Sequence, residues 1–434
     1  MKTLGLDIGT TSICAVIYDS AEGVLTSRTV CNNSFLPGES WERIQDPLLI
    51  YTTADTLVRE LLAEHPDTAA IGLSGQMHGI LYLDASGDPV SPLYTWQDGR
   101  GQLPYDETQS WSDRLSALTG YPLASGYGLV THYYNLHHGL VPENAAKLCT
   151  VQDYLAMKFS GRTVPVTDAT NAASLGLYDP KIHGFDPVAL KACGIDPSLL
   201  PDITTTPRLG TGILGIPVYA AIGDNQASFL GAAGGRTDAL LINMGTGGQI
   251  SVYSSDFLQI PSLETRPFPD GGWLLVGASL CGGRSYALLE SFFRETVKMV
   301  TGQEISAYDA MDATLAQADR FHDPLQVVTT FQGTRKDPGL RGSIRNISAE
   351  NFTPAHLIYG VMEGMARELY DMYRSFLNSG GTAPAVIIGS GNGLRKNPHL
   401  RRVFEHTFGA PLTLSGNDEE AACGAAIYAA KHNI

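Results

Sequence analysis

Two short turns rich in glycine and threonine hold the residues of this chain that are best suited to bind phosphate. The first turn, Gly9-Thr10-Thr11, follows the expected strand Leu4–Asp7, and the second, Gly245-Thr246-Gly247, follows an apolar run at 241–244. Successive backbone N–H groups in such a turn form an anion-binding nest, and threonine hydroxyls add further donors. Two nests could hold a polyphosphate, although both segments could equally be ordinary hairpin turns.

Two carboxylates stand where strands are expected to end. Asp7 closes the first strand, and a carboxylate beside a phosphate turn can hold Mg²⁺ through water. Asp224 follows the apolar segment Val218–Ile222, so its side chain could accept the proton of a hydroxyl that attacks a γ-phosphate. The same spacing fits a helix N-cap aspartate, and both interpretations of Asp224 stay open at this point.

Other phosphate-binding signatures are absent from the sequence. No Gly-Lys dipeptide occurs, which excludes a P-loop. One GxGxxG pattern spans Gly210–Gly215, but it leads into Pro217 and an expected strand. A dinucleotide-binding fingerprint requires a helix after the glycines, so this pattern does not predict one.

Regular elements are expected around these turns from the periodicity of apolar residues. A helix is expected at Pro47–Glu64, with an apolar stripe that begins at Leu48 and Leu49. The remaining expected strands are Ser12–Tyr18, Val24–Val30, Ala69–Leu73, Gln249–Tyr253 and Ala385–Ile388, and the remaining helices are Pro354–Asn378, one from about Asn397, and Glu419–Lys431.

The segments around the two turns match one another at a constant offset of 236 residues, with Asp7 facing Asn243 in the match. Such a repeat suggests two related α/β halves, each a mixed sheet flanked by helices, facing each other across a cleft. The glycine- and alanine-rich stretch Ala232–Asp238 is the expected joint. The predicted domains are therefore 1–231 and 232–434.

Composition excludes several functional classes. The 44 acidic and 29 basic residues give a net charge of −15, which argues against a nucleic-acid or anionic membrane partner. The six scattered cysteines include no CxxC, so a zinc site is not predicted, and reduced thiols are expected. With neither a signal peptide nor an 18-residue apolar run, a cytoplasmic protein is expected.

Five segments, in this order, resemble the FGGY family of carbohydrate kinases: Gly5–Ser12, Gly75–Gly79, Gly223–Asn225, Met244–Gly247 and Gly389–Gly391. The resemblance implies two actin-like, ribonuclease H-like domains and transfer of the γ-phosphate of ATP to a sugar hydroxyl. Thr95–Arg100 and the stretch from Thr167 to Ser174 are similar to the members that act on sedoheptulose, which implies a ketose substrate. Members that act on xylulose share several of these segments, so xylulose is the alternative sugar.

The resemblance also implies a role for each matched residue, with Asp224 as the catalytic base. The residues implied to bind ATP and Mg²⁺ are Asp7, Thr10, Thr11, Ser12, Gly245, Thr246, Gly282, Gly283, Gly389, Gly391, Asn392 and Asn397, with Asp7 on the metal side. The residues implied to contact the sugar are Gln76, Met77, His78, Trp96, Asp98 and Asn225. His78 could instead be a core histidine, Trp96 could simply pack, and Arg100 could be a structural ion-pair partner.

Cys14 departs from the family pattern, in which a lysine or arginine often stands at this position. A basic side chain there would help to neutralise the charge of the transferred phosphate. Two alternatives to a sugar kinase remain: an actin-like ATPase that works as a switch, and a sugar-sensing pseudo-kinase, which Cys14 favours. The expected assembly is a monomer or a homodimer.

Overall fold

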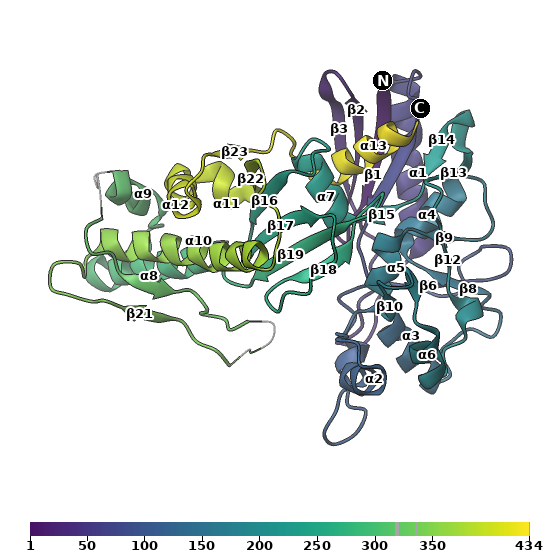
Figure 1. Ribbon diagram of the computed structural model, residues 1–434, viewed down its shortest axis with the longest axis horizontal. Helices are drawn as coiled ribbons and strands as arrows, with labels where there is room; N and C mark the ends of the chain where they lie inside the picture. Colours follow the sequence, from purple (N-terminus) through teal and green to yellow (C-terminus); the bar gives the residue numbers. More distant parts are fainter. Residues whose placement is uncertain (317–320, 335–336, 338, 434) are drawn as a thin grey trace. The chain divides into compact units, whose positions relative to one another are not determined.

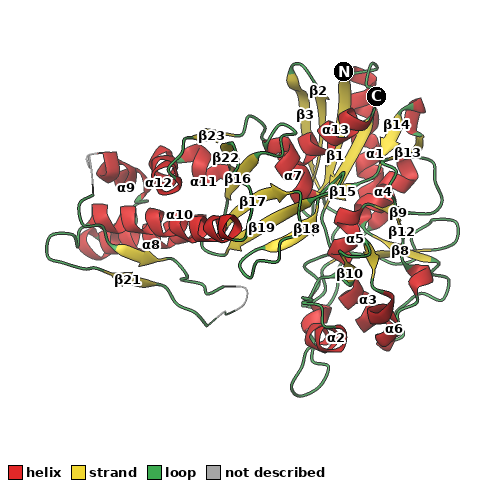
Figure 2. Cartoon of the chain, viewed as in Figure 1, coloured by secondary structure: helices red, strands yellow, loops and turns green. Residues whose placement is uncertain are grey.

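The computed structural model describes residues 1–316, 321–334, 337 and 339–433, and the chain forms two compact units. Unit 1 consists of Met1–Gly235, Pro267–Gly271 and Asn417–Ile434, and unit 2 of Arg236–Arg266 and Gly272–Gly416. Both units combine strands and helices (Figures 1 and 2), as expected of an α/β protein. The units differ from the expected consecutive halves because the segment from Asn417 onward belongs with unit 1.

The main sheet of unit 1 is mixed. It has the strand order β13 (Arg208–Thr211), β14 (Pro217–Tyr219), β5 (Ile71–Gly75), β1 (Lys2–Ile8), β2 (Ser12–Asp19) and β3 (Gly23–Cys31), with β15 (Ile222–Gly223) also paired to β5. Strand β1 runs antiparallel to β2 and parallel to β5, and β15 runs parallel to β5. The expected strands around the first turn are thereby confirmed, and the ends of β1, β5 and β15 lie at one edge of the sheet.

Helices and short strand pairs complete unit 1. The helices are α1 (Pro47–Glu64), α2 (Trp111–Thr119), α3 (Gly128–His137), α4 (Val151–Phe159), α5 (Ala169–Leu175), α6 (Pro187–Ala192), α7 (Asp224–Ala232) and α13 (Glu420–His432), with 3-10 turns η1 (Gly99–Gln102), η2 (Pro197–Leu199) and η3 (Ile213–Gly215). The short pairs are β4 (Ile44–Gln45) with β7 (Leu93–Tyr94), β6 (Leu81–Leu83) with β8 (Lys147–Cys149), β9 (Val166–Thr167) with β12 (Asp202–Ile203), and β10 (Tyr178–Asp179) with β11 (Gly184–Phe185).

Helix α1 has the predicted bounds but buries a different face at its start. Asp46 caps it by accepting hydrogen bonds from the backbone N–H groups of Leu48 and Leu49. Both leucines are nevertheless exposed, and Ile50 is the first apolar residue after Pro47 to be buried. The predicted stripe was therefore wrong at its first turn, where these side chains face solvent.

Helix α13 packs on β1, β2, β5 and α7, which is why the last segment belongs to unit 1 (Figure 1). A Cβ atom at Gly5 of β1 would collide with the carbonyl of Ala422, and one at Gly72 of β5 would collide with that of Ala425. Glycine is required at both positions because the helix backbone lies directly on the sheet. Part of the glycine content of the chain thus serves helix–sheet packing.

Unit 2 repeats the arrangement of the unit 1 sheet. Its strand order is β18 (Glu264–Pro267), β19 (Trp273–Ser279), β17 (Gly248–Ser254), β16 (Ala239–Met244), β22 (Val386–Ser390) and β23 (Leu412–Leu414). Strand β16 is antiparallel to β17 and parallel to β22, as β1 is to β2 and β5. The internal repeat expected from the sequence is confirmed, with β16 in the place of β1.

The helices of unit 2 pack around this sheet and on each other. They are α8 (Gly283–Thr301), α9 (Tyr308–Ala316), α10 (Pro354–Asn378), α11 (Gly391–Lys396) and α12 (Pro398–Phe408), and β20 (Gln326–Val328) pairs with β21 (Ser343–Arg345) beside them. Helix α10 has the predicted bounds, and it buries Val361, Met365 and Leu369 against β17 and β19.

Candidate functional site

The carboxylate of Asp7 lies at the end of β1, immediately before the first glycine–threonine turn. Strand pairing places Ser74 of β5 beside it, and the Ser74 hydroxyl donates a 2.6 Å hydrogen bond to Asp7 Oδ1. Burial raises the pKa of Asp7 to about 7, the Ser74 hydrogen bond opposes this, and the carboxylates of Asp224 and Glu419 raise it further. Three carboxylates are therefore near enough to interact, which favours a cation at this place.

Mg²⁺ fits this environment as a partner of Asp7. Mg²⁺ prefers oxygen ligands, keeps several waters, and is commonly held by one or two carboxylates together with substrate phosphates. Among the described residues there is no cluster of three or more His, Cys, Asp or Glu that could hold a metal by itself. Asp7, acting directly or through water, would contribute negative charge and orientation to a metal that also binds phosphate.

A closed ring of hydrogen bonds holds the first turn. The Thr10 hydroxyl donates to Gln76 Oε1 (3.2 Å), Gln76 Nε2 donates to Gln45 Oε1 (2.9 Å), and Gln45 Nε2 returns to the Thr10 carbonyl (2.8 Å). Trp96 Nε1 also donates to the Thr10 hydroxyl (3.0 Å). Thr10, predicted on the phosphate side, is therefore joined to Gln76 and Trp96, predicted on the sugar side.

Two residues that hold the first turn, Gln45 and Asn32, were not predicted from the sequence. Gln45 is fully buried within the ring, and Asn32 Nδ2 donates to the Gly9 carbonyl (2.9 Å). Gln45 stands directly before the Asp46 helix cap, a position at which no pattern of residue types indicates a buried amide. Asn32 also donates its backbone N–H to the Thr11 carbonyl.

Asp224 is the first residue of helix α7, and Gly223 occupies the N-cap position. Asp224 is therefore not the N-cap residue of α7, and no side chain caps this helix at Gly223. Pairing of Gly223 with Gly75 of β5 places Asp224 at the same sheet edge as Asp7. Asn225 Nδ2 donates to Asp224 Oδ1 (3.0 Å), so these two predicted residues contact each other.

Met77 and His78 follow β5 and contact other parts of unit 1. Met77 is buried against Gly223, where an added Cβ would lie 2.8 Å from the Met77 sulfur. His78 has a φ of 76°, a conformation that non-glycine residues seldom adopt. The centroid of its ring lies 4.5 Å from that of the Tyr127 ring, and its Nδ1 forms a hydrogen bond with the Ser174 carbonyl of α5. A strained backbone that surrounding contacts hold is typical of a functional position.

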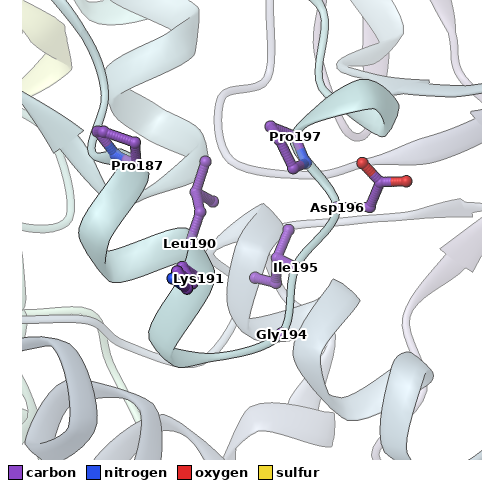
Figure 3. A pocket seen from close by; sticks show the side chains of 7 residues that line it. All are labelled: Pro187, Leu190, Lys191, Gly194, Ile195, Asp196 and Pro197. Carbon is purple, nitrogen blue, oxygen red and sulfur yellow. The ribbon is translucent and has the colours of Figure 1, made fainter.

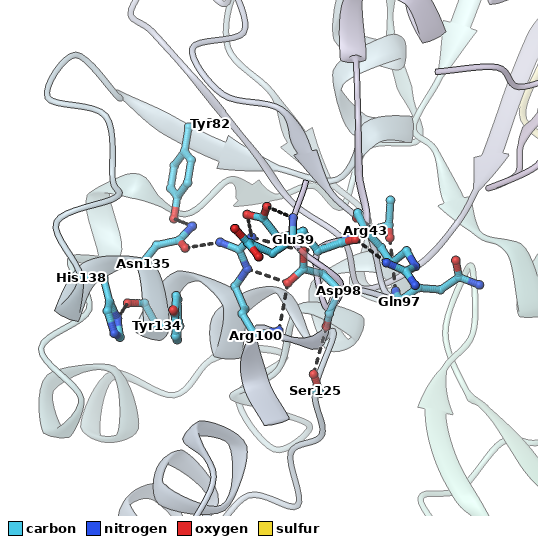
Figure 4. Close-up of polar contacts among 12 residues, drawn as sticks. Glu39, Arg43, Tyr82, Gln97, Asp98, Arg100, Ser125, Tyr134, Asn135 and His138 are labelled. Carbon is cyan, nitrogen blue, oxygen red and sulfur yellow. Dashed lines mark hydrogen bonds and ion pairs between the residues drawn. The ribbon is translucent and has the colours of Figure 1, made fainter. Parts of the chain in front are cut away.

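Asp98 lies in a buried ion pair with Arg100 (Figure 4). Arg100 Nε donates to Asp98 Oδ1 (2.6 Å), and Asp98 Oδ2 accepts from the backbone N–H of Arg43 (3.1 Å). Arg100 also donates to Asn135 and lies over the Tyr94 ring at 4.1 Å. These contacts establish the structural role considered for Arg100, and they favour the same role for Asp98 over contact with a sugar.

In unit 2, the second turn lies against the start of helix α8. The backbone N–H of Gly283 donates to the Gly245 carbonyl (2.9 Å), and that of Arg284 donates to the Thr246 carbonyl (3.0 Å). A Cβ at Gly282 would collide with the backbone of Gly247. The structure therefore brings together Gly245, Thr246, Gly282 and Gly283, four residues that the resemblance implies for ATP binding.

The other predicted nucleotide residues of unit 2 follow β22. Gly389 lies within β22. Gly391, with a φ of 82°, begins helix α11 beside the Asn243 side chain. Asn392 is exposed on α11, whereas the Asn397 side chain accepts from the backbone N–H of Leu400 and caps α12. Asn397 thus stabilises the start of α12.

Cys14 is buried beneath α13 with Ala422, Cys423 and Ala426. Burial raises the pKa of the Cys14 thiol to about 12, so the thiol is neutral near pH 7 and supplies no positive charge. All six cysteines are free thiols.

A surface hollow of about 330 Å³ lies between α6 and η2 (Figure 3). It is lined by Pro187, Leu190, Lys191, Gly194, Ile195, Asp196 and Pro197, and it includes no predicted site residue. The hollow therefore plays no part in the candidate site. Within the described part of the chain, no helix has the length and apolar character needed to cross a membrane.

Both halves of the chain match known domains. Residues 2–231 match the N-terminal domain, and residues 240–432 the C-terminal domain, of the FGGY family of carbohydrate kinases. Sedoheptulokinase of Mus musculus is 29% identical, with 100% of this chain and 98% of that protein covered. Xylulose kinase of Escherichia coli (strain K12) is 24% identical, with 98% and 89% covered.

Solved structures share the fold. The xylulose kinase from Rhodospirillum rubrum gives a TM-score of 0.84 at 23% identity, covering 99% of this chain and 89% of that one. A xylulose kinase from Brucella ovis gives 0.83 at 21% identity, with 100% and 90% covered. These similarities support the actin-like two-domain fold that the sequence predicted.

Proposed function

Because the chain belongs to the FGGY family of carbohydrate kinases, we propose that it transfers the γ-phosphate of ATP to a hydroxyl of a ketose sugar with Asp224 as the catalytic base. The observation that carries this proposal is the shared sheet edge of Asp7 and Asp224, next to the hydrogen-bonded ring that joins Thr10 to Gln76. This edge offers a metal-binding carboxylate, a proton acceptor and polar groups that can contact a sugar.

In the proposed reaction, the Asp224 carboxylate accepts the proton of the attacking sugar hydroxyl. ATP supplies the phosphoryl group, and Mg²⁺ neutralises phosphate charge when bound. Asp7 orients the metal, while the turn at Thr10, Thr11 and Ser12 donates hydrogen bonds to phosphate oxygens. Gly245 and Thr246 of unit 2 are proposed for the same task, with Gly282, Gly283, Gly389 and Gly391 for the nucleoside.

The proposed sugar is sedoheptulose, phosphorylated at the hydroxyl farthest from its carbonyl to give sedoheptulose 7-phosphate. Support comes from the sedoheptulokinases of Mus musculus and Homo sapiens, which cover the whole chain at 29% and 28% identity. Gln76, Met77, His78 and Asn225 are the proposed sugar contacts, and Trp96 is a further one through its exposed ring. Six free thiols accord with the cytoplasmic location expected for such an enzyme.

The test is an ADP-release assay with ATP, Mg²⁺ and a panel of sedoheptulose, xylulose, ribulose, gluconate and glycerol. We expect sedoheptulose to give the highest kcat/KM, and xylulose well above sedoheptulose would contradict the proposed sugar. ATP hydrolysis at the same rate without any sugar would contradict kinase function and favour an ATPase switch.

The Asp224→Asn variant tests the base. Its kcat should fall by about 10²- to 10⁴-fold, the usual contribution of a general base, while ATP affinity stays unchanged. Asp186→Asn is the matched control, since Asp186 is a carboxylate of the same unit that caps α6 and accepts a hydrogen bond from the Tyr121 hydroxyl, and it is not among the predicted site residues. Near-normal turnover of Asp224→Asn would remove Asp224 from the catalytic role.

A further inference from the structure

Helix α5 bonds to the chain at two positions just before Asp224, Ala221 and Gly223. The Thr170 hydroxyl accepts a 3.0 Å hydrogen bond from the backbone N–H of Gly223, the residue before Asp224. Asn171 Nδ2 donates a 2.9 Å hydrogen bond to the carbonyl of Ala221. Because Thr170 and Asn171 are both fully buried, these bonds fix the backbone from which the Asp224 side chain projects.

The last turn of the same helix holds His78. The Ser174 hydroxyl accepts from the backbone N–H of His78 (3.1 Å), and the Ser174 carbonyl lies 2.7 Å from His78 Nδ1. A carbonyl can only accept, so this contact places a proton on Nδ1. Ser174 thus fixes the ring orientation of His78 and helps to hold its unusual backbone conformation.

A buried network anchors the helix itself. Asp153 accepts hydrogen bonds from the hydroxyls of Thr150 and Thr167, both at 2.8 Å, and from Asn171 Nδ2 at 3.3 Å. Gln152 Nε2 donates to Asn171 Oδ1 (2.9 Å). Asn171, near the start of α5, is therefore bonded directly to α4 and is linked through Asp153 to Thr167 of β9.

We infer that α5 is a positioning helix, in which Thr170 sets the location of the proton-accepting Asp224 and Ser174 sets that of the sugar-side His78. This inference rests on the proposed function of those two residues. The two ends should act on different kinetic constants. Displacement of the base by about 1 Å can cost roughly 100-fold in rate, whereas release of His78 weakens binding of the sugar alone.

Thr170→Val keeps the shape of the side chain and removes the acceptor for the Gly223 N–H. We expect kcat to fall by about 10- to 100-fold, with sugar KM and ATP affinity unchanged, and Thr170→Ser to restore most of the loss. Thr3→Val is the matched control, because the Thr3 hydroxyl is equally buried and donates to the Ala426 carbonyl elsewhere in unit 1. Thr3→Val should lower the melting temperature and leave kcat unchanged.

Ser174→Ala removes the acceptor for the His78 backbone N–H. We expect sugar KM to rise roughly tenfold, as expected for the loss of about one good interaction, with ATP KM unchanged and kcat nearly so. If this variant does not fold, Ser174→Thr, which retains the hydroxyl, and Ser174→Cys form the informative pair. A fall in kcat without a rise in sugar KM would overturn the role given to Ser174.

The outcomes separate this inference from the proposed function. Normal turnover by Asp224→Asn would refute the assigned base and the Thr170 role with it. An inactive Asp224→Asn variant combined with Thr170→Val kinetics equal to those of Thr3→Val would overturn the positioning role alone. The expected result is an inactive Asp224→Asn variant, a kcat effect at Thr170 and a KM effect at Ser174.

Discussion

The two units place the same pair of positions at the end of corresponding strands, but they fill them with different chemistry. In unit 1, Asp7 of β1 is paired with Ser74 of β5, and the serine donates to the carboxylate at 2.6 Å. In unit 2, Asn243 of β16 is paired with Ser390 of β22, and the asparagine amide donates to the serine hydroxyl at 3.3 Å. The backbone arrangement is conserved between the units, and the direction of the hydrogen bond is reversed.

A single change of side chain therefore gives corresponding positions of one repeated framework a different charge. A carboxylate attracts a divalent cation, whereas an amide has no charge to repel a phosphate and can donate a hydrogen bond. The acid therefore suits a position beside a metal ion, and the amide suits a position beside a phosphate.

The largest expected effect comes from making unit 1 resemble unit 2. Asp7→Asn removes the charge proposed to hold Mg²⁺, and Mg²⁺-dependent turnover should fall by about 10- to 100-fold, as losses in a metal's surroundings typically do. The measurement is the initial rate over a series of Mg²⁺ concentrations. Asp67→Asn, at an exposed carboxylate that pairs with Lys2, should behave like wild type. Unchanged Mg²⁺ dependence in Asp7→Asn would contradict the metal assignment.

The reverse substitution should weaken nucleotide binding. Asn243→Asp introduces a negative charge beside the second glycine–threonine turn, and like charges in contact cost enough to weaken binding roughly tenfold or more. ATP affinity measured by calorimetry checks this expectation, with Asn243→Ser as an uncharged control. If both variants bind ATP equally well, the charge at this position does not matter.

A smaller effect is expected from the serines, and it concerns stability. Hydrogen bonds to charged groups contribute about 1.5–3 kcal/mol, and those between neutral groups about 0.5–1.5 kcal/mol. Ser74→Ala should therefore lower the melting temperature more than Ser390→Ala at pH 8. Equal losses at pH 8 would mean that the two pairs are energetically alike.

A further effect is a dependence of stability on pH that only the acidic pair can have. Burial raises the pKa of Asp7 from 3.8 to about 7, so the folded protein keeps this proton to a higher pH than the unfolded chain. The stability that Asp7 contributes is present below about pH 4 and is lost as the pH rises through 7, by at most about 1.4 kcal/mol per pH unit. Without Mg²⁺, Asp7→Asn should therefore gain in melting temperature over wild type from pH 5 to pH 8. A constant difference between the two proteins would contradict this shift.

Local features were predictable from the sequence, because periodicity and end signals act within one element. Helices Pro47–Glu64 and Pro354–Asn378 have the predicted bounds, and the paired turns identified the internal repeat. The buried face was less predictable: Leu48 and Leu49 point to solvent although they are apolar. Which side of a helix meets the sheet depends on packing that the local pattern does not contain.

Features that depend on distant residues were not predictable. Gln45 joins the ring around Thr10 only because β4 lies beside the first turn, and no spacing in the sequence reveals that proximity. Asp98 was predicted to contact a sugar, and the hydrogen bond that it accepts from the backbone N–H of Arg43, 55 residues away, was not predicted. The assignment of α13 to unit 1 depends on close packing against Gly5 and Gly72.

The contact between β1 and α13 has a consequence for how the protein is made. The ribosome synthesises residues 2–8 long before residues 420–432. At a synthesis rate of roughly 5–20 residues per second, the interval between them is on the order of 20 to 80 seconds. Throughout that time one face of the first sheet lacks the helix that covers Gly5 and Gly72 in the finished protein. Unit 2 is meanwhile synthesised almost in full and can fold first, so the half that begins the chain is completed last.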